Sequence, residues 1–209
     1  PRGAGSPRSP ATAHEAKGTE TEAHPDAQLY YHRLGTPQAE DILVVDSDPV
    51  TRSSMWHCDV TDDGQWLILD NSKDTDNKMR YYAASLADGV SSRMAWIPIS
   101  SDFAFMLDYI ANDNTRFYML SNKDAPNYRI VSFELDPTKA RVVDPVSQMT
   151  VAITCFTDIV PEDPQAILTT AAVLDHNNLL AVYSRDVKDE LWVFALTTGA
   201  RSTRLLPAR

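Results

Sequence analysis

The sequence predicts an all-β fold, a partial β-propeller of about three four-stranded antiparallel blades plus a half blade. Three observations support this prediction. Short runs rich in apolar and β-branched residues follow one another along most of the chain, three tight turns separate pairs of these runs, and no window keeps apolar residues at helical spacing for three turns. Repetition of one strand unit is typical of a fold built from blades rather than from one packed core.

The three turns share their chemistry and their setting. Each lies between two strand-like runs and ends in Gly or Asn, the residues that best tolerate the positive φ of a hairpin turn. The turns read Thr61-Asp62-Asp63-Gly64, Ala111-Asn112-Asp113-Asn114 and Asp175-His176-Asn177-Asn178.

The expected strands fall into four groups. A half blade is predicted at 29–34 and 41–45. Three full blades follow, each an antiparallel set of four strands as propeller blades are. Their strands are expected at 55–60, 65–69, 79–86 and 94–99; at 103–110, 116–120, 128–135 and 140–143; and at 166–174, 179–183, 191–196 and 204–206.

Residues 145–158 interrupt the repeat. The distance between turns grows from 50 residues (Asp62 to Asn112) to 64 residues (Asn112 to His176), and removing these 14 residues restores 50. The segment carries an apolar run at 149–156 for which the predicted blades have no strand position. It is therefore expected to be an insertion. Either it is an extra strand or loop, or it derives from an incorrect gene model such as a retained intron, and the second explanation is favoured.

Composition limits the location and the partners of the chain. Residues 1–17 are mostly small and polar and are predicted to be disordered, which leaves 18–209 as the propeller domain. The formal charge of −10 argues against nucleic acid and anionic membranes as partners, because both require clustered cations. No run approaches the roughly 18 apolar residues of a membrane helix. No secretory signal is recognised, so a cytoplasmic location is expected.

The sequence shows no catalytic centre, and neither a cofactor nor a metal ion is expected. A Gly-x-Ser-x-Gly motif does not occur, and seven glycines are too sparse for a phosphate-binding loop. The five histidines lack metal-ligand spacing. His57 adjoins Cys58, but neighbours on a strand point to opposite faces. Both cysteines, Cys58 and Cys155, are expected to be reduced and buried.

Other polar and aromatic residues fit structural roles. Asp59, Asp62 and Asp63 surround one turn, where Asx-turn hydrogen bonding is favoured over cation binding. His176 is expected to be exposed at the tip of its turn. Six aromatic residues are expected to fill the space between blades: Trp56, Trp66, Tyr81, Tyr82, Trp96 and Trp192.

Arg80 is the one candidate for a substrate-cavity residue. It lies on a predicted strand beside Tyr81 and Tyr82. Its guanidinium could point into a propeller channel and bind an acidic group of a peptide, although a surface position is favoured.

Longer stretches of the sequence resemble the propeller of the prolyl oligopeptidases. The resemblance covers about 18–207, except 145–158, and its segments occur in the family's order. They are Gly18-Thr19-Glu20-Thr21-Glu22, Leu29-Tyr30-Tyr31-His32-Arg33-Leu34-Gly35-Thr36, Glu40-Asp41-Ile42-Leu43, Val60-Thr61-Asp62-Asp63-Gly64, Ala125-Pro126-Asn127-Tyr128-Arg129 and Ser184-Arg185-Asp186-Val187-Lys188.

This resemblance implies a serine peptidase that cleaves short peptides after proline. In that family a seven-bladed propeller covers an α/β-hydrolase domain, which holds the catalytic Ser, Asp and His, and excludes large proteins. The partners implied are therefore that hydrolase domain and short proline-containing peptides, and no catalytic residue is assigned here. A propeller cysteine of the family approaches the substrate, whereas the matching strand, 80–86, carries Ala84. Arg80 matches a cavity-facing arginine of that strand.

Two hypotheses remain open. The chain is a substrate-gating fragment of a prolyl-oligopeptidase-like enzyme, inactive alone, or it is a stand-alone propeller scaffold that binds proteins or peptides. A reading frame that continues into a nucleophile motif would favour the enzyme. Whether the parent enzyme hydrolyses or cyclises peptides stays open as well.

Overall fold

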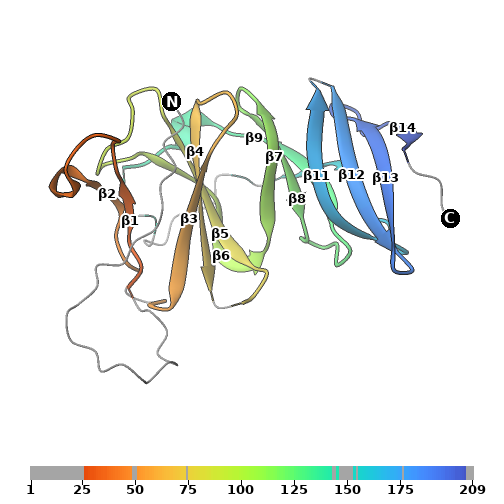
Figure 1. Ribbon diagram of the computed structural model, residues 1–209, viewed down its shortest axis with the longest axis horizontal. Helices are drawn as coiled ribbons and strands as arrows, with labels where there is room; N and C mark the ends of the chain where they lie inside the picture. Colours follow the sequence, from red (N-terminus) through yellow and green to blue (C-terminus); the bar gives the residue numbers. More distant parts are fainter. Residues whose placement is uncertain are drawn as a thin grey trace. The chain divides into compact units, whose positions relative to one another are not determined.

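The computed structural model describes residues 26–48, 51–73, 75–142, 145, 153, 155–175 and 177–205, and in these residues it is all-β (Figure 1). The described strands form three four-stranded antiparallel sheets and one two-stranded sheet. Two short 3₁₀ helices, Gln38–Glu40 and Pro137–Lys139, are the helices of this part of the chain. The predicted three blades and half blade are therefore confirmed. None of these described helices is long and apolar enough to cross a membrane.

The first of two compact units holds the half blade and one full sheet. It contains the described parts of Pro1–Val60, Gly64–Phe103 and Pro137–Ala152. The half blade pairs β1 (Leu29–Tyr31) with β2 (Ile42–Val45). The full sheet has the order β3-β4-β5-β6, with bounds Ser54–Val60, Trp66–Lys73, Met79–Ser85 and Trp96–Phe105, the last two residues of β6 falling in the second unit.

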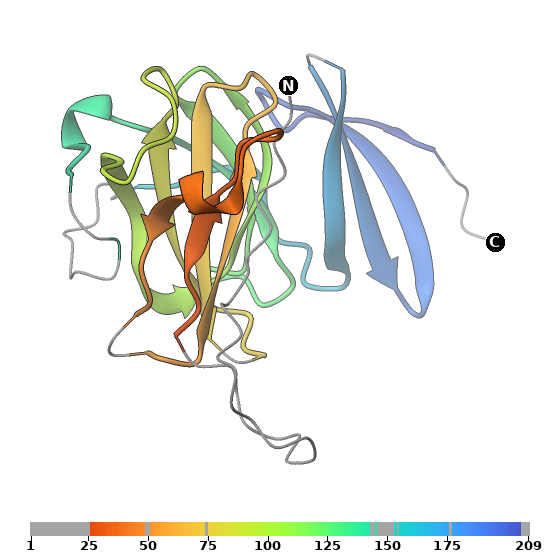
Figure 2. The same cartoon turned by 60° about the vertical axis from the view of Figure 1, so that its left-hand side comes forward.

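The second unit holds the other two sheets. It contains Thr61–Asp63, Ala104–Asp136 and the described parts of Ile153–Arg209. One sheet has the order β10-β9-β8-β7, with β7 at Leu107–Asp113, β8 at Arg116–Ser121, β9 at Arg129–Glu134 and β10 at Thr157–Val160. The other has the order β11-β12-β13-β14, with bounds Ile167–Asp175, Asn178–Arg185, Lys188–Ala195 and Arg201–Arg204. Figure 2 shows the twist of the β11-β12-β13-β14 sheet from another side.

Each unit has its own apolar core. In the first, Trp56, Tyr82 and Trp96 pack with apolar residues of β1, β2 and β4. In the second, residues of β8, β10, β11, β12 and β13 pack together, and they include Leu168, Leu179 and Phe194. Of the six aromatic residues expected to fill the space between blades, five are buried and Trp192 is half-buried. Large aromatic rings therefore contribute to the packing of these cores.

The outer strand of the second full sheet differs from the prediction. A strand at 140–143 was expected, but Arg141 makes only an isolated bridge with Trp96. The strand that pairs with β9 is β10 instead. This pairing joins residues that are far apart in the sequence, since Thr157 lies opposite Ser132, and local patterns do not predict it. The prediction at 140–143 is therefore wrong.

Residues 156–158, at the end of the predicted insertion, pack into the second unit. The Phe156 ring makes edge contacts with Phe133 at 5.4 Å and with Phe105 at 5.9 Å between centroids. Asp158 lies on β10, and its Oδ1 is 2.9 Å from Nη1 of Arg129. Residues 146–152 lie outside the described residues, so the origin of the insertion stays open.

The three predicted turns connect the expected pairs of strands, and the second of them is shifted. The turn after β3 reaches Gly64 at a φ of 71°. The second turn lies two residues later than expected, because β7 extends to Asp113 and Asn114 takes the positive φ of 53°. The third joins β11 to β12, and its predicted tip, His176, lies outside the described residues.

Candidate functional site

Arg80 is mostly buried in the first unit, where a carboxylate and an aromatic ring fix its side chain. Its Nη1 donates to Oδ2 of Asp48 at 2.7 Å, and its guanidinium carbon lies 4.4 Å from the centre of the Phe103 ring. The Arg80 side chain is 15% exposed and that of Asp48 is 1% exposed. The favoured surface position is therefore wrong, and the acidic group that Arg80 meets belongs to this chain.

The Asp48 carboxylate is fixed from two directions. Besides the bond from Arg80, its Oδ1 accepts a hydrogen bond from the Thr51 amide at 2.9 Å. The Arg80 Nε is buried and has no hydrogen-bond partner among the described residues. The two side chains thus form a buried, charge-assisted pair in which the Arg80 Nε donor is unsatisfied among the described residues. Ala84, which stands where the family carries a cysteine, is fully buried in β5.

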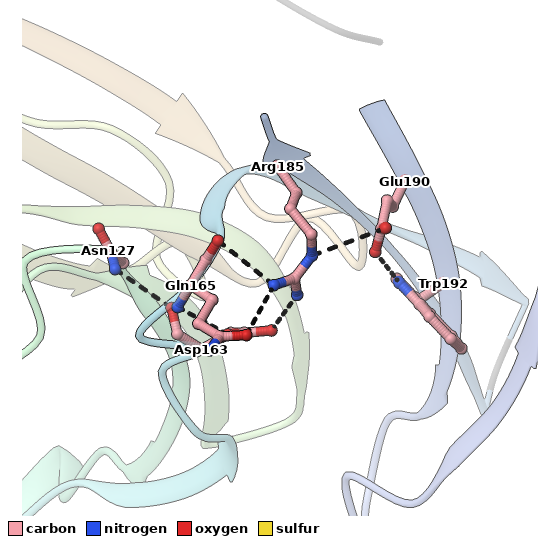
Figure 3. Close-up of polar contacts among 6 residues, drawn as sticks. All are labelled: Asn127, Asp163, Gln165, Arg185, Glu190 and Trp192. Atoms are coloured by element: carbon pink, nitrogen blue, oxygen red, sulfur yellow. Dashed lines mark hydrogen bonds and ion pairs between the residues drawn. The ribbon is translucent and has the colours of Figure 1, made fainter. Parts of the chain in front are cut away.

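A second polar cluster lies in the second unit around Arg185, the last residue of β12 (Figure 3). Its Nη2 donates to Oδ2 of Asp163 at 2.5 Å. Its Nη1 donates to the backbone oxygen of Gln165 at 3.3 Å and to Oε1 of the same residue at 3.4 Å. Its Nε lies 3.6 Å from Oε1 of Glu190 on β13. One guanidinium therefore joins the β10–β11 connection to two neighbouring strands.

The β8–β9 connection is attached to the same cluster. Nδ2 of Asn127 donates to the backbone oxygen of Asp163 at 3.2 Å, and the Asn127 amide donates to Oε1 of Glu162 at 2.6 Å. The Leu168 amide in turn donates to the Asn127 oxygen at 3.0 Å. At the other side, Nε1 of Trp192 donates to Oε2 of Glu190 at 3.2 Å. Two connections of this unit, β8–β9 and β10–β11, are thereby fixed to each other and to strands β12 and β13.

Hydrogen bonds and burial shift the pKa values of two residues in or beside this cluster. The Gln165 amide, followed by the Arg185 guanidinium, holds the pKa of Asp163 below its ordinary value against the opposing effect of burial. Burial raises the pKa of the neighbouring Tyr183 phenol to about 12. Both groups therefore keep one charge state throughout the neutral pH range, as members of a structural cluster do.

We expect Arg185→Gln to raise the pKa of Asp163 only part of the way to its ordinary value, because the Gln165 amide remains. A lowered pKa contributes stability above the unfolded value of about 3.9, and this contribution is lost as the pH falls through the folded pKa. The substitution should therefore shift acid unfolding to higher pH. Carboxyl chemical shifts during a pH titration measure the pKa, and an unchanged Asp163 titration would contradict the described pair.

The other predicted site residues lie apart from these clusters. On β3, Cys58 is half-buried, and burial raises the pKa of its thiol. Cys155 is exposed, so the prediction that both thiols are buried is wrong. Asp63 Oδ1 accepts a hydrogen bond from the Thr61 hydroxyl at 2.6 Å, and Asp63 Oδ2 accepts one from Nδ2 of Asn112 at 2.7 Å. Within the described residues no group of three or more His, Cys, Asp or Glu could hold a metal ion.

Comparison with known proteins identifies the family. Residues 11–208 match the model of the prolyl oligopeptidase N-terminal β-propeller domain. The chain belongs to this family. The match includes both polar clusters and residues 145–158, and it begins seven residues before the predicted domain start at Gly18.

Individual relatives agree with this assignment. Prolyl oligopeptidase A of Amanita bisporigera is 33% identical over 93% of this chain, which covers 24% of that protein. A dual function macrocyclase-peptidase of Galerina marginata is 29% identical over 90% of this chain, covering 24% of that protein. The solved apo structure of prolyl oligopeptidase B from Galerina marginata superposes with a TM-score of 0.78 and 27% identity over 96% of this chain and 25% of that one. The chain thus spans about a quarter of the length of the prolyl oligopeptidases that it matches.

Sequence reasoning identified Arg80 but not the residues around it. Asp48 and Phe103 are 32 and 23 positions away from Arg80 in the chain, and no local pattern connects them. The same is true of the Arg185 cluster, whose members lie on the β8–β9 and β10–β11 connections and on strands β12 and β13. Two stretches that carried the resemblance, at 125–129 and 184–188, contain Asn127 and Arg185, but neither residue was assigned a role.

Proposed function

We propose that this chain is the substrate-gating propeller of a prolyl-oligopeptidase-like serine endopeptidase that hydrolyses short peptides after proline. The family match over residues 11–208 supports this proposal most strongly. A solved relative, prolyl oligopeptidase B of Galerina marginata, has been captured with a 35-residue hydrolysis and macrocyclization substrate, and it superposes with a TM-score of 0.76 and 28% identity over 93% of this chain and 25% of that one. The partners proposed are a hydrolase domain of the parent enzyme and short proline-containing peptides.

Arg80 is proposed to lie in the wall of the substrate cavity. Its ion pair with Asp48 and the Phe103 ring hold the guanidinium in one orientation, which lowers the entropy lost when a peptide carbonyl binds to it. A buried pair of this kind also carries little net charge. We therefore expect it to orient neutral peptide backbone rather than to select acidic peptides.

A peptidase assay tests the proposal. The complete gene product should cleave a chromogenic substrate after proline, and residues 1–209, which carry no Gly-x-Ser-x-Gly motif, should not. In the complete enzyme Arg80→Met should lower kcat/KM about tenfold, as expected for the loss of one charge-assisted hydrogen bond. Arg52→Met, which removes an exposed arginine of the same unit, is the control and should leave kcat/KM unchanged.

Other outcomes would point elsewhere. Inhibitor-sensitive turnover by residues 1–209 would contradict the proposed inactivity of this part. Tight peptide binding by residues 1–209 without any post-proline cleavage by the gene product would favour the stand-alone scaffold. Product analysis by mass spectrometry separates linear from cyclic peptides.

A cytoplasmic location is proposed as well, supported by two cysteines that form no disulfide, and cell fractionation tests it.

A further inference from the structure

The two-residue turn between β12 and β13 carries a valine in an unfavourable backbone conformation. The last paired residues are Arg185 and Lys188, and between them Asp186 has a φ of 49° and Val187 a φ of 61°. Such turns prefer Asn-Gly or Gly-Gly, because both central residues take positive φ. A β-branched residue in this region is an outlier. The turn itself therefore gives no reason for a valine at this position.

Burial within the described chain gives no reason either. The Val187 side chain is 100% exposed, the most exposed of the large apolar residues described. Apolar surface in water contributes nothing to folding, and strained residues that persist are concentrated at functional sites. The residue is thus unfavourable for this chain on two independent grounds, its backbone conformation and its exposure.

The turn is presented from a fixed base. Arg185, its first flanking residue, bonds to Asp163 and Gln165 and pairs with Glu190, as Figure 3 shows. The β8–β9 connection is attached to the same base through Asn127. A tip held in this way loses little conformational entropy when it docks. Its geometry is therefore suited to binding in one orientation.

The length of the matched relatives indicates the partner. The turn connects the second and third strands of its own sheet, β12 and β13. The chain spans only about a quarter of the prolyl oligopeptidases that it matches, so most of such an enzyme is available as an occupant. An apolar tip requires an apolar depression in that partner surface.

We propose that the Asp186–Val187 tip is an apolar docking point for the hydrolase domain of the parent enzyme, with Arg185 as the residue that positions it. This inference rests on the proposed function. Docking would bury Val187, and the energy gained there would offset the strain of its backbone. The tip would thus help to set the orientation of the propeller on the hydrolase domain.

Thiol accessibility tests the docking. Val187→Cys, combined with Cys155→Ser to remove the exposed native thiol, is reacted with a maleimide in residues 1–209 and in the complete enzyme. We expect the thiol at position 187 to react at least tenfold more slowly in the complete enzyme. Leu174→Cys is the control, because Leu174 is also exposed but lies beside the β11–β12 turn, at the opposite end of the same sheet. It should react equally in both proteins.

Equal rates at position 187 in both proteins would overturn the docking proposal, even if the complete enzyme cleaves after proline. Protection of position 187 without post-proline cleavage would instead contradict the proposed function and leave the docking intact. Protection in residues 1–209 that grows with protein concentration would assign the tip to self-association and overturn the proposal. Val187→Asn should raise the urea midpoint of residues 1–209, and a lower midpoint would show that Val187 serves local stability, which also overturns it.

Discussion

Gly199→Ala should destabilise the chain by about 3 kcal/mol or more, because both backbone conformation and space oppose a side chain there. Gly199 has a φ of 67°, and a Cβ at this position would lie 1.6 Å from the backbone oxygen of Ile159. The atoms that a Cβ would meet belong to the Ile159 backbone and not to the end of a flexible side chain. The β13–β14 turn or the β10 strand must therefore move. Urea unfolding followed by tryptophan fluorescence measures the change.

Gly64→Ala is the matched control for this prediction. Gly64 has a similar φ of 71°, but nothing lies within 4 Å of a Cβ built on it. Its substitution should cost only the strain of the left-handed conformation, about 1 kcal/mol. Equal losses for the two variants would contradict the described contact between Gly199 and the end of β10, and with it the assignment of β10 as the outer strand.

Asp48→Asn should destabilise the chain by about 3 kcal/mol, because it leaves the Arg80 cation mostly buried without its counter-ion. The amide oxygen of Asn can still accept the bond from the Thr51 amide, so the substitution isolates the charge. The double variant Asp48→Asn with Arg80→Met should be less destabilised than Asp48→Asn alone, since the unpaired cation is then absent.

An exposed ion pair of the same unit provides the control. Arg52 donates to Asp26 through Nε at 2.8 Å and through Nη2 at 2.5 Å, but the two side chains are 62% and 43% exposed. Asp26→Asn should leave the urea midpoint almost unchanged, because surface pairs contribute little. A loss for Asp48→Asn no larger than that for Asp26→Asn would show that the Asp48–Arg80 pair is not a buried one.

Local patterns were sufficient to predict most strands and turns. Hairpins depend on neighbours in sequence, so the Asp-Asp-Gly turn at 62–64 and the β-rich runs beside it predicted β3 and β4. The segment at 140–143 was predicted as a strand as well, but its described residues form one isolated bridge, between Arg141 and Trp96. Its place beside β9 is taken by β10, whose Thr157 and Asp158 pair with Ser132 and Val131, residues far away in the sequence. Which of two segments pairs with the edge of a sheet depends on how each packs against distant residues. Local β-propensity does not report that packing.

The sites were less predictable, because they depend on pairings across the fold. Arg80 was recognised by its strand neighbours and by resemblance, yet its burial depends on Asp48, which follows another strand of the same unit. The Arg185 cluster combines residues from positions 127–192, and their sequence spacing gives no sign of contact. Cys155 was expected to be buried from the general behaviour of free thiols, but its position just before β10 leaves it exposed.

The central claim is that this propeller gates a serine peptidase, and active-site labelling of the natural protein tests it most directly. An antibody raised against residues 26–205 is used to isolate the protein from its native cells, which are treated with a fluorophosphonate probe. We expect a labelled protein much larger than 23.3 kDa, with labelling blocked by a proline-containing transition-state inhibitor. Recovery of a single unlabelled protein of 23.3 kDa would contradict the account.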